Sequence, residues 1–319
     1  MRTEQQNHIV HKVINEVANA IVGKDAIIIR VFLAILAGGH ILIEDIPGVG
    51  KTTLAIAFSK ALNLGYSRVQ FTPDVLPSDI TGFSIYDKNT AEMRFTPGAV
   101  MCNLFLADEL NRATSRTQSA LLEAMEEGQV TVDGVSHVIN QPFIVIATQN
   151  PVGAAGTQLL PDSQMDRFMV RLSLGYPSHK NELELLERKK GRNLLDLVNP
   201  VLTKAQLENM RTEVDNVHIH PNVVDYIVKI IGRTRQHPDL LLGASPRASL
   251  ALAAMAKAVA FTQGRDYVIP EDIYPVINET IAHRLLLRPG VENEGVTATT
   301  IIQGILKATK APNKIKVNR

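Results

Sequence analysis

The stretch ILIEDIPGVGKTT, residues 41–53, decides the fold, because a short apolar run leads directly into a glycine-rich turn. The general phosphate-binding pattern is Gly, four residues, then Gly-Lys followed by Ser or Thr. Its Gly-Lys-Thr end is present at residues 50–52, whereas Asp45 stands at its first position. Gly48 and Gly50 still allow the backbone to turn sharply and to aim N–H groups at phosphate oxygens. The sequence therefore predicts a phosphate loop after a buried strand.

A helix is expected to begin at about Lys51, so that its positive end faces the bound anion. Lys51 would reach the β and γ phosphates of ATP, and the Thr52 hydroxyl would ligate Mg²⁺. A plain tight turn is the alternative, and the apolar helical pattern that begins at Leu54 argues against it. The loop residues predicted to bind the nucleotide are Pro47, Gly48, Val49, Gly50, Lys51, Thr52 and Thr53.

Two carboxylates, Asp108 and Glu109, follow the apolar run LFLA at residues 104–107. Adjacent carboxylates at the end of a buried strand repel each other, and a bound cation removes that cost. We therefore predict that Asp108 holds Mg²⁺ together with Thr52, and that Glu109 polarises the attacking water as a general base. A strand end that simply meets solvent is the alternative for this pair.

Three further residues are candidates for acting on the γ-phosphate. Asn150 follows the apolar run at residues 143–147, and its amide can orient the attacking water; an Asn-Pro turn is the alternative. Arg167 can pair with Asp166 or act as an arginine finger toward a neighbouring subunit. Arg247 lies in the first turn of a predicted helix, where the helix dipole disfavours a cation. A local anion is therefore expected beside it, and ATP phosphate is the obvious candidate.

Short apolar runs alternate with helical patterns, which is typical of a parallel sheet covered on both faces. The five runs are residues 41–43, 68–71, 103–107, 143–147 and 168–172. Two stretches interrupt the alternation and predict β-hairpins, one at residues 83–95 and one at residues 129–139. The second contains Asp133-Gly134, a strong signal for a tight turn. The fold class is therefore α/β, with two hairpins inserted into the layered core.

The chain is predicted to divide near Tyr176-Pro177. Residues 1–176 would form the nucleotide-binding core, including N-terminal helices that break at residues 22–24. Residues 177–319 show purely helical patterns and would form a smaller all-helical domain that ends in a short basic tail. Its helices are expected at about residues 178–190, 204–214, 221–236, 246–263 and 270–287.

Composition and charge exclude several classes of protein. Hydrophobic residues make up 45% of the chain and charged residues 20%, as in a globular protein with a sizeable core. The net charge of +1 disfavours a non-specific nucleic-acid binder. The single cysteine, Cys102, fits a cytoplasmic location, and no apolar stretch is long enough to span a bilayer. The GTPase motif Asn-Lys-x-Asp is absent, which favours ATP over GTP.

These motifs together resemble the MoxR group of AAA+ ATPases over nearly the whole chain. Asp45 departs from the general phosphate loop but agrees with many MoxR sequences. The segments that carry the resemblance are residues 44–52 (EDIPGVGKT), 107–113 (ADELNRA), 147–151 (ATQNP), 160–168 (LPDSQMDRF) and 243–247 (GASPR).

The resemblance implies an AAA+ αβα sandwich with a five-stranded parallel sheet, two inserted hairpins and a helical lid. It implies ATP and Mg²⁺ as cofactors, with Asn150 as sensor 1, Arg167 as a finger acting across a subunit interface, and Arg247 as sensor 2. A further segment matches the one that contacts adenine, although hydrophobic packing explains its two aliphatic residues equally well. That segment is Ile21, Val22 and Gly23.

Members of the group assemble into rings, usually hexamers, and act as chaperone-like remodellers that mature or activate protein complexes. Their partners often contain von Willebrand factor A domains. The expected function is therefore an Mg²⁺-dependent ATPase that drives such remodelling. The alternatives are a metal-chelatase-like motor subunit, a nucleic-acid-dependent motor of the same clade, and a nucleotide-gated scaffold. Glu109 and Asn150 argue against the scaffold, because it would not need a hydrolytic site.

Overall fold

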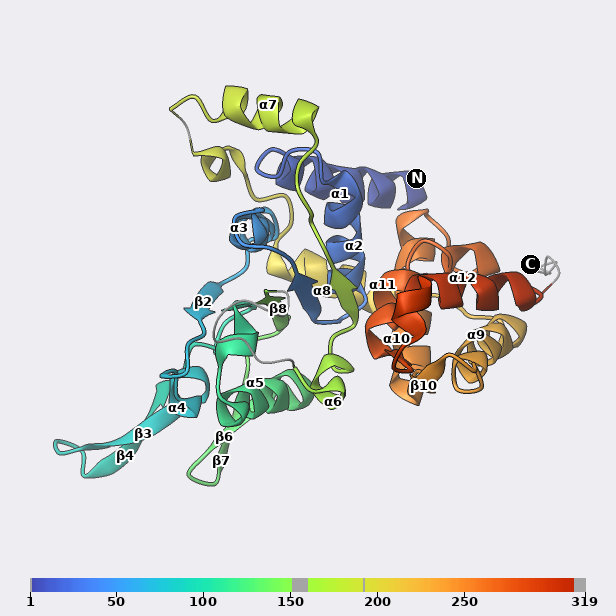
Figure 1. Ribbon diagram of the computed structural model, residues 1–319. Coiled ribbons are helices and arrows are strands. Elements are labelled where there is room, and N and C mark those ends of the chain that lie inside the picture. The colour runs from blue at the N-terminus through green and yellow to red at the C-terminus, as the bar shows by residue number, and fades with distance from the viewer. Residues whose placement is uncertain (1, 151–159, 192, 313–319) are drawn as a thin grey trace.

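The computed structural model describes residues 2–150, 160–191 and 193–312 (Figure 1). It begins with two helices, α1 (Arg2–Ala18) and α2 (Asp25–Leu36), which are separated at the break that the sequence predicts. The next elements, in chain order, are β1 (Ile41–Glu44), α3 (Lys51–Ala61), β2 (Tyr66–Gln70), α4 (Pro77–Thr81), β3 (Gly82–Asp87), β4 (Glu92–Pro97), β5 (Leu104–Asp108), α5 (Ser115–Glu127), β6 (Gln129–Val132), β7 (Val135–Val138), β8 (Ile144–Gln149), α6 (Asp162–Met165) and β9 (Val170–Leu172).

Five of these strands form one sheet in the order β2-β5-β8-β1-β9. Every neighbouring pair is parallel; Ile41 of β1, for example, lies opposite Ile146 of β8 and Val170 of β9. The predicted five-stranded parallel sheet is confirmed. Because the strands are parallel, the segments that follow β1, β5 and β8 meet at one edge of the sheet, where α/β proteins bind their ligands.

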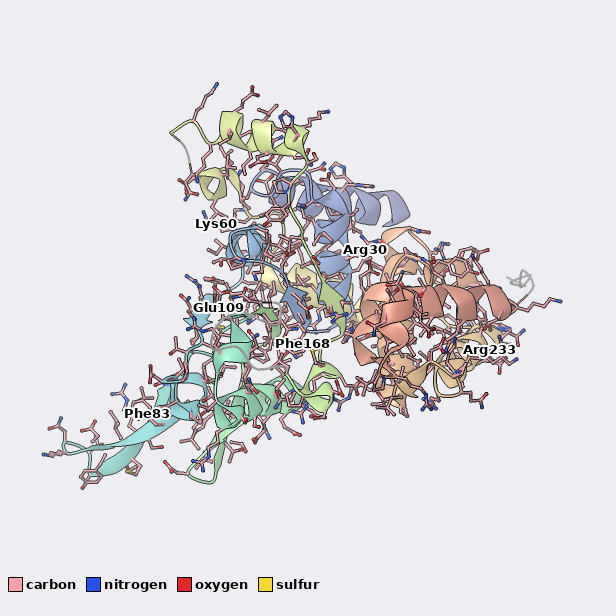
Figure 2. All side chains as sticks on the ribbon, viewed as in Figure 1. Arg30, Lys60, Phe83, Glu109, Phe168 and Arg233 are labelled. Carbon is pink, nitrogen blue, oxygen red and sulfur yellow. The ribbon has the colours of Figure 1, made fainter. Side chains whose placement is uncertain are left out.

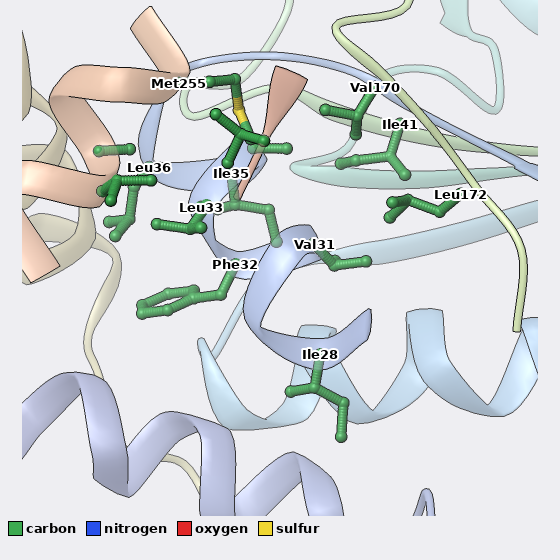
Figure 3. Close-up of a cluster of buried hydrophobic side chains, with 14 of the residues drawn as sticks. Ile28, Val31, Phe32, Leu33, Ile35, Leu36, Ile41, Val170, Leu172 and Met255 are labelled. Atoms are coloured by element: carbon green, nitrogen blue, oxygen red, sulfur yellow. The ribbon is translucent and has the colours of Figure 1, made fainter. Parts of the chain in front are cut away.

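Alternate residues along the strands face two separate hydrophobic clusters, as the strand period of two requires. Ile41 and Ile43 face the cluster that contains α1, α2 and α3, whereas Leu42 faces the cluster that contains Leu121 and Met125 of α5. Full burial of one such aliphatic side chain contributes about 1.5–3 kcal/mol. Figure 3 shows the side chains of α2 beside those of β1 and β9. Helices therefore cover both faces of the sheet, which confirms the αβα arrangement.

Both predicted hairpins are present as two-stranded antiparallel ribbons, β3–β4 and β6–β7. Asp133 and Gly134 have φ angles of +50° and +78°, the left-handed conformation that their tight turn requires. The β3–β4 ribbon extends away from the sheet (Figure 1), and the exposed side chain of Phe83 lies on it (Figure 2). The rings of Phe95 and His137 stack with 3.7 Å between their centroids, so the two ribbons contact each other.

The chain after β9 is mainly helical. Its elements are α7 (His179–Arg188), α8 (Lys204–Asp215), α9 (Pro221–Thr234), β10 (Leu240–Leu242), α10 (Pro246–Thr262), α11 (Ile277–Ile281), β11 (Leu286–Leu287) and α12 (Ala298–Ala308), with short 3₁₀ turns between them. The first four predicted helices are confirmed to within a few residues. The prediction of one helix over residues 270–287 is wrong, because Pro275 lacks the N–H that a helix interior needs. The antiparallel pair β10–β11 and helix α12 were not predicted.

The helical part, hereafter the lid, packs against the sheet-containing part through α2. Met255 of α10 lies in the same hydrophobic cluster as the α2 side chains (Figure 3), and Arg30 of α2 pairs with Glu279 of α11 at 2.7 Å. The domain boundary between residues 176 and 177 remains a prediction. Within the described ranges, no helix is long and apolar enough to cross a membrane.

Candidate nucleotide-binding site

The predicted phosphate loop leaves the carboxyl end of β1 and runs into the first turn of α3. Gly48 and Gly50 have φ angles of +86° and +100°, which only glycine adopts without strain. A Cβ on Gly48 would meet nothing within 4 Å, so this glycine is required by its backbone conformation and not by crowding. Helix α3 begins at Lys51, as predicted, and its first free N–H groups therefore face the loop. This arrangement suits an anion.

Asp45 has a structural role in this loop. Its Oδ1 accepts a hydrogen bond from the N–H of Ile46 at 2.9 Å. Its Oδ2 accepts from the Ser173 hydroxyl at 2.9 Å and from the N–H of Gly175 at 2.6 Å. Burial raises the pKa of Asp45, but these hydrogen bonds outweigh it, and the pKa lies below its ordinary value. The carboxylate thus ties the start of the loop to the chain after β9.

Lys51 points into the site and is buried, at 7% exposure. Its Nζ donates to the carbonyl oxygens of Asp45 at 2.6 Å and Gln149 at 3.4 Å, and to Oδ1 of Asn150 at 3.0 Å. Burial lowers the pKa of Lys51, and nearby carboxylates, chiefly that of Asp45, oppose the shift. The amide of Asn150 also donates from Nδ2 to Oε1 of Glu109 at 3.1 Å. One side chain therefore joins Lys51 to Glu109.

Asp108 ends β5 with both carboxylate oxygens engaged. Oδ1 accepts from the Thr148 hydroxyl at 2.6 Å. Oδ2 accepts from Nη2 and Nε of Arg68 at 2.7 and 3.2 Å, and lies 3.4 Å from the hydroxyl oxygen of Thr52. Carboxylate and hydroxyl oxygens are ligands that Mg²⁺ prefers, and a cationic group already contacts Oδ2. The residues present therefore fit a hard divalent cation.

Glu109 adopts a left-handed backbone conformation, with φ +58° and ψ +44°, which is uncommon for a residue with a side chain. Its N–H donates to the Thr148 hydroxyl at 2.9 Å, which holds this turn in place. Its Oε2 accepts from Nη1 of Arg112 at 2.9 Å, while Oε1 accepts from Asn150. The turn thus directs the carboxylate of Glu109 toward Asn150.

A cavity of about 300 Å³ adjoins the phosphate loop. Its lining combines loop residues, the turn between α1 and α2, and helix α7, and includes Ala20, Ile21, Val22, Gly48, Val49, Gly50, Thr53, Asn181 and Leu185. A mostly apolar cavity beside backbone N–H groups is what a purine base attached to phosphates requires. The predicted base-contacting residues Ile21 and Val22 and the predicted loop residue Thr53 are therefore brought together.

Gly23 follows the cavity residues and allows α7 to approach them. Its φ angle is +70°, and a Cβ at this position would lie 1.9 Å from Nδ2 of Asn181. Beside it, the Lys24 ammonium donates to the carbonyl oxygens of Leu174 at 2.5 Å and Tyr176 at 2.9 Å. Gly23 and Lys24 thus hold the start of α7 against the cavity.

Arg167 and Arg247 lie together, but away from the phosphate loop of their own chain. Arg167 precedes β9 and so lies at the amino edge of the sheet, whereas the loop follows β1 at the carboxyl edge. Both arginines pair with Glu126, Arg167 at 3.2 Å and Arg247 at 2.6 Å. Glu126 is eleven residues beyond Ser115, the start of α5 near the carboxyl edge, or about 16 Å along the helix.

The anion beside Arg247 in this structure is the carboxylate of Glu126, and the expected contact of Arg247 with an ATP phosphate stays a prediction. Asp166, the predicted alternative partner of Arg167, instead accepts from the Ser245 hydroxyl at 3.0 and 3.2 Å and pairs with Arg284 at 3.5 Å. The lid therefore holds the residue next to Arg167, and Arg167 itself extends toward α5.

The sequence reasoning missed three residues of this region. Thr148, which touches both Asp108 and Glu109, could have been found because it is a buried hydroxyl two residues before Asn150. Arg68 lies on β2, and only the strand order places β2 beside β5. Glu126 is one of several acidic residues on α5, and nothing in the sequence marks it as the partner of both arginines.

Comparisons with known proteins agree with this geometry. A model of the ATPase family associated with various cellular activities (AAA) matches residues 40–170, and a model of the AAA lid domain matches residues 232–305. Together with the phosphate loop and the acidic pair at residues 108–109, these matches define the class of the protein as an AAA+ ATPase.

Individual relatives indicate which family of AAA+ ATPases the chain resembles. The uncharacterized protein YeaC of Bacillus subtilis is 45% identical over 97% of this chain and 97% of its own length. Chaperone MoxR1 of Mycobacterium tuberculosis is 36% identical over 96% of this chain and 83% of its own length. A crystal structure of a candidate ATPase from Cytophaga hutchinsonii matches with a TM-score of 0.90 and 38% identity, and covers 98% of this chain and 97% of that one.

Magnesium-chelatase subunit ChlI of Chlorella vulgaris is more distant, with 29% identity over 58% of this chain and 52% of its own length.

The chain belongs to the MoxR family of AAA+ ATPases. The predicted family, fold class and ATPase activity are thereby confirmed.

Proposed function

We propose that this ATPase binds ATP with Mg²⁺ between two subunits of a ring and uses hydrolysis for chaperone-like remodelling or maturation of a protein complex. The observation that carries the proposal is the run of contacts from Lys51 through Asn150 to Glu109 at the carboxyl edge of the sheet. One amide touches both the residue assigned to the γ-phosphate and the residue assigned to the attacking water. An amide in this position can place the attacking water beside the γ-phosphate, which hydrolysis requires and nucleotide binding alone does not.

In this proposal the nucleotide lies along the phosphate loop. Backbone N–H groups of residues 48–52 bind the β-phosphate, and Lys51 contacts the β and γ phosphates. The adenine occupies the cavity that Ile21 and Val22 line, with Gly23 allowing α7 to close against it. Pro47, Val49 and Thr53 complete the loop and the cavity wall.

Thr52 and Asp108 are the residues that would hold Mg²⁺. The bound metal would supply positive charge against the phosphate oxygens. Asp108 presents Oδ2 on the side of Thr52 because Thr148 binds its other oxygen. Glu109 then accepts a proton from water, and Asn150 fixes the position of that water relative to the γ-phosphate.

The arginines support a composite site. Arg167 and Arg247 lie at the opposite edge of the sheet from Lys51 and converge on Glu126, so they are arranged as a pair for a second subunit. A head-to-tail arrangement places the same surface of each chain against the next and closes into a ring. We propose Arg167 as the finger and Arg247 as sensor 2 at that interface, in a ring that is a hexamer.

The client is proposed by analogy with the relatives. MoxR1 is named a chaperone, and we infer conformational work on a protein complex in the cytoplasm, with a von Willebrand factor A domain protein as a candidate partner. A chelatase-like motor subunit is the second candidate, because ChlI matches over half of the chain. Co-purification with a large tetrapyrrole-binding subunit would favour that second role. A nucleic-acid motor is disfavoured by the net charge of +1.

The test is the variant Glu109→Gln, which keeps the shape of the side chain and removes the base. We expect steady-state phosphate release to fall by about 10²- to 10⁴-fold, the usual contribution of a general base. ATP affinity, measured by equilibrium binding, should stay within about twofold of wild type, because Glu109 contacts the water and not the nucleotide.

The matched control is Glu123→Gln, which makes the same chemical change on the exposed face of α5. It should leave phosphate release unchanged. Wild-type turnover in Glu109→Gln would exclude Glu109 as the base, and absence of phosphate release from the wild-type protein in every assembly state would exclude the ATPase proposal itself.

A further inference from the structure

Arg68 binds the Asp108 oxygen that faces Thr52. Its Nη2 and Nε both donate to Oδ2, at 2.7 and 3.2 Å, and Thr52 lies 3.4 Å from the same atom. The Asp108 side chain is 10% exposed, whereas that of Arg68 is 41% exposed. The carboxylate is therefore fixed in the interior, while the guanidinium reaches it from the surface of the edge strand β2.

Arg68 is not needed to orient this carboxylate. Thr148 already holds Oδ1 of Asp108 at 2.6 Å, and the backbone of Asp108 is fixed within the sheet between β2 and β8. Two nitrogens of Arg68 and the Thr52 hydroxyl all donate to Oδ2. A metal ion or one of its water ligands could therefore bind this oxygen only in place of one of these donors.

The guanidinium and a divalent cation would also repel each other across one shared oxygen. The exchange costs little on the arginine side, because the half-exposed Arg68 can return to water, and the bound metal would replace its charge beside the buried carboxylate. A divalent cation with phosphate ligands interacts more strongly with the same carboxylate. Of the two cations, Arg68 is the one that leaves.

We propose that Arg68 is an exchangeable counter-ion of Asp108, which Mg²⁺ must displace, and that it thereby sets the Mg²⁺ concentration at which nucleotide binds. The inference rests on the proposed function, since it takes Asp108 as the carboxylate on the metal side. The opposite role, in which Arg68 supports Asp108 as a metal ligand, predicts a change of opposite sign. Removal of a supporting partner weakens metal binding by 10- to 100-fold, as a general rule.

The test measures binding of a fluorescent, non-hydrolysable ATP analogue to the full-length chain while MgCl₂ is titrated. For Arg68→Gln we expect the half-saturating Mg²⁺ concentration to fall about three- to tenfold, as removal of a weak competing ion pair predicts. Arg68→Lys keeps the charge on a single nitrogen and should give a value between wild type and Arg68→Gln. Arg68→Lys also allows the shift in half-saturating Mg²⁺ concentration to be measured if Arg68→Gln folds poorly.

The matched control is Arg112→Gln. Arg112 is exposed to a similar extent, at 36%, and pairs with the neighbouring carboxylate of Glu109 at 2.9 Å. The substitution removes the same charge from the same region, but Arg112 does not contact Asp108. The half-saturating Mg²⁺ concentration of Arg112→Gln should therefore stay within about twofold of wild type.

Three results would overturn the inference: a rise in half-saturating Mg²⁺ for Arg68→Gln, no change, or an equal fall for Arg112→Gln. The last result would mean that the overall electrostatic field of the site, and not the contact of Arg68 with Asp108, determines Mg²⁺ binding. The measurement needs no hydrolysis, so the inference and the proposed function can fail separately. If the wild-type chain does not bind the analogue at any Mg²⁺ concentration, the proposed function fails. If it binds and Arg68→Gln changes nothing, only the inference fails.

Discussion

The carboxylate of Asp45 accepts hydrogen bonds from Ile46, Ser173 and Gly175, all at the base of the phosphate loop. Replacing it with glycine would restore the residue of the general phosphate-loop pattern, yet it would leave three donors without their acceptor. Each hydrogen bond to a buried charge contributes about 1.5–3 kcal/mol, and the contributions overlap. We expect Asp45→Gly to lower the free energy of unfolding by about 3 kcal/mol, measured by urea denaturation.

Asp45→Asn serves as the comparison, because it retains one carbonyl oxygen in the same position. Its loss of stability should be smaller than that of Asp45→Gly. If Asp45→Gly were as stable as wild type, the role assigned here to the carboxylate would be wrong.

Single residues also show where sequence reasoning succeeds. Lys51, Asp108 and Glu109 were predicted to line one site because each follows a recognisable strand, and the structure places them together. Their chemical roles remain predictions until they are tested. Arg68 and Glu126 were missed because their partners lie far away in the chain, and a lone arginine or glutamate carries no local signal of its partner.

Between elements, the lid is joined to the segment just before strand β9 through a buried histidine. Nε2 of His283 lies 3.1 Å from the carbonyl oxygen of Phe168, and Arg284 donates to the same oxygen at 2.7 Å. Burial, followed by the charge of Arg284, lowers the pKa of His283 from 6.5 to about 3. The imidazole is therefore neutral in the folded protein at physiological pH.

This shift makes the stability of the lid contact depend on pH. Above pH 6.5 neither state of His283 binds a proton, so its contribution is fully present. As the pH falls below that value, His283 binds a proton in the unfolded chain but not in the folded chain, and stability is lost until about pH 3. We expect a loss of about 2 kcal/mol from this residue between pH 7 and pH 5.

Urea denaturation of wild type and His283→Gln at both pH values measures this contribution. Glutamine can still donate to the Phe168 carbonyl but does not titrate. Between the two pH values, the free energy of unfolding of His283→Gln should therefore fall by about 2 kcal/mol less than that of wild type. Equal losses in the two proteins would contradict the assignment, whatever the stability of the variant at neutral pH.

Elements with strong local signals were predicted well. The turn at Asp133-Gly134 and the helices α7 to α10 have such signals. The β10–β11 pair could not be predicted, because Leu240 and Leu287 pair across a long stretch of chain and neither strand exceeds three residues. The helix expected over residues 270–287 is interrupted at Pro275, and the prediction did not take into account the effect of proline in a helix interior.

At the scale of the assembly, the separation of Lys51 from Arg167 makes a specific prediction. Lys51→Ala and Arg167→Ala should each abolish ATPase activity when every subunit carries the change. An equal mixture should recover activity, because a site with Lys51 from one subunit and Arg167 from its neighbour is intact. Random mixing leaves about one quarter of the sites complete in a closed ring.

The measurement is phosphate release from mixed rings, with the oligomeric state followed by light scattering. Mixtures prepared from each variant and wild type provide the reference for subunit exchange. No recovery in a mixture that demonstrably exchanges subunits would show that Arg167 does not act across the interface.

The lid contacts on either side of Arg167 have a consequence for communication. Asp166 binds Ser245 and Arg284 of the lid, and the carbonyl of Phe168 binds Arg284 as well. Any force that reorients the lid is therefore transmitted to the guanidinium between them. By thermodynamic reciprocity, engagement of that guanidinium by a phosphate biases the lid by the same free energy. In the proposed ring, contact of Arg167 with a neighbour's nucleotide would therefore act on the lid directly, without a change at the subunit's own ATP.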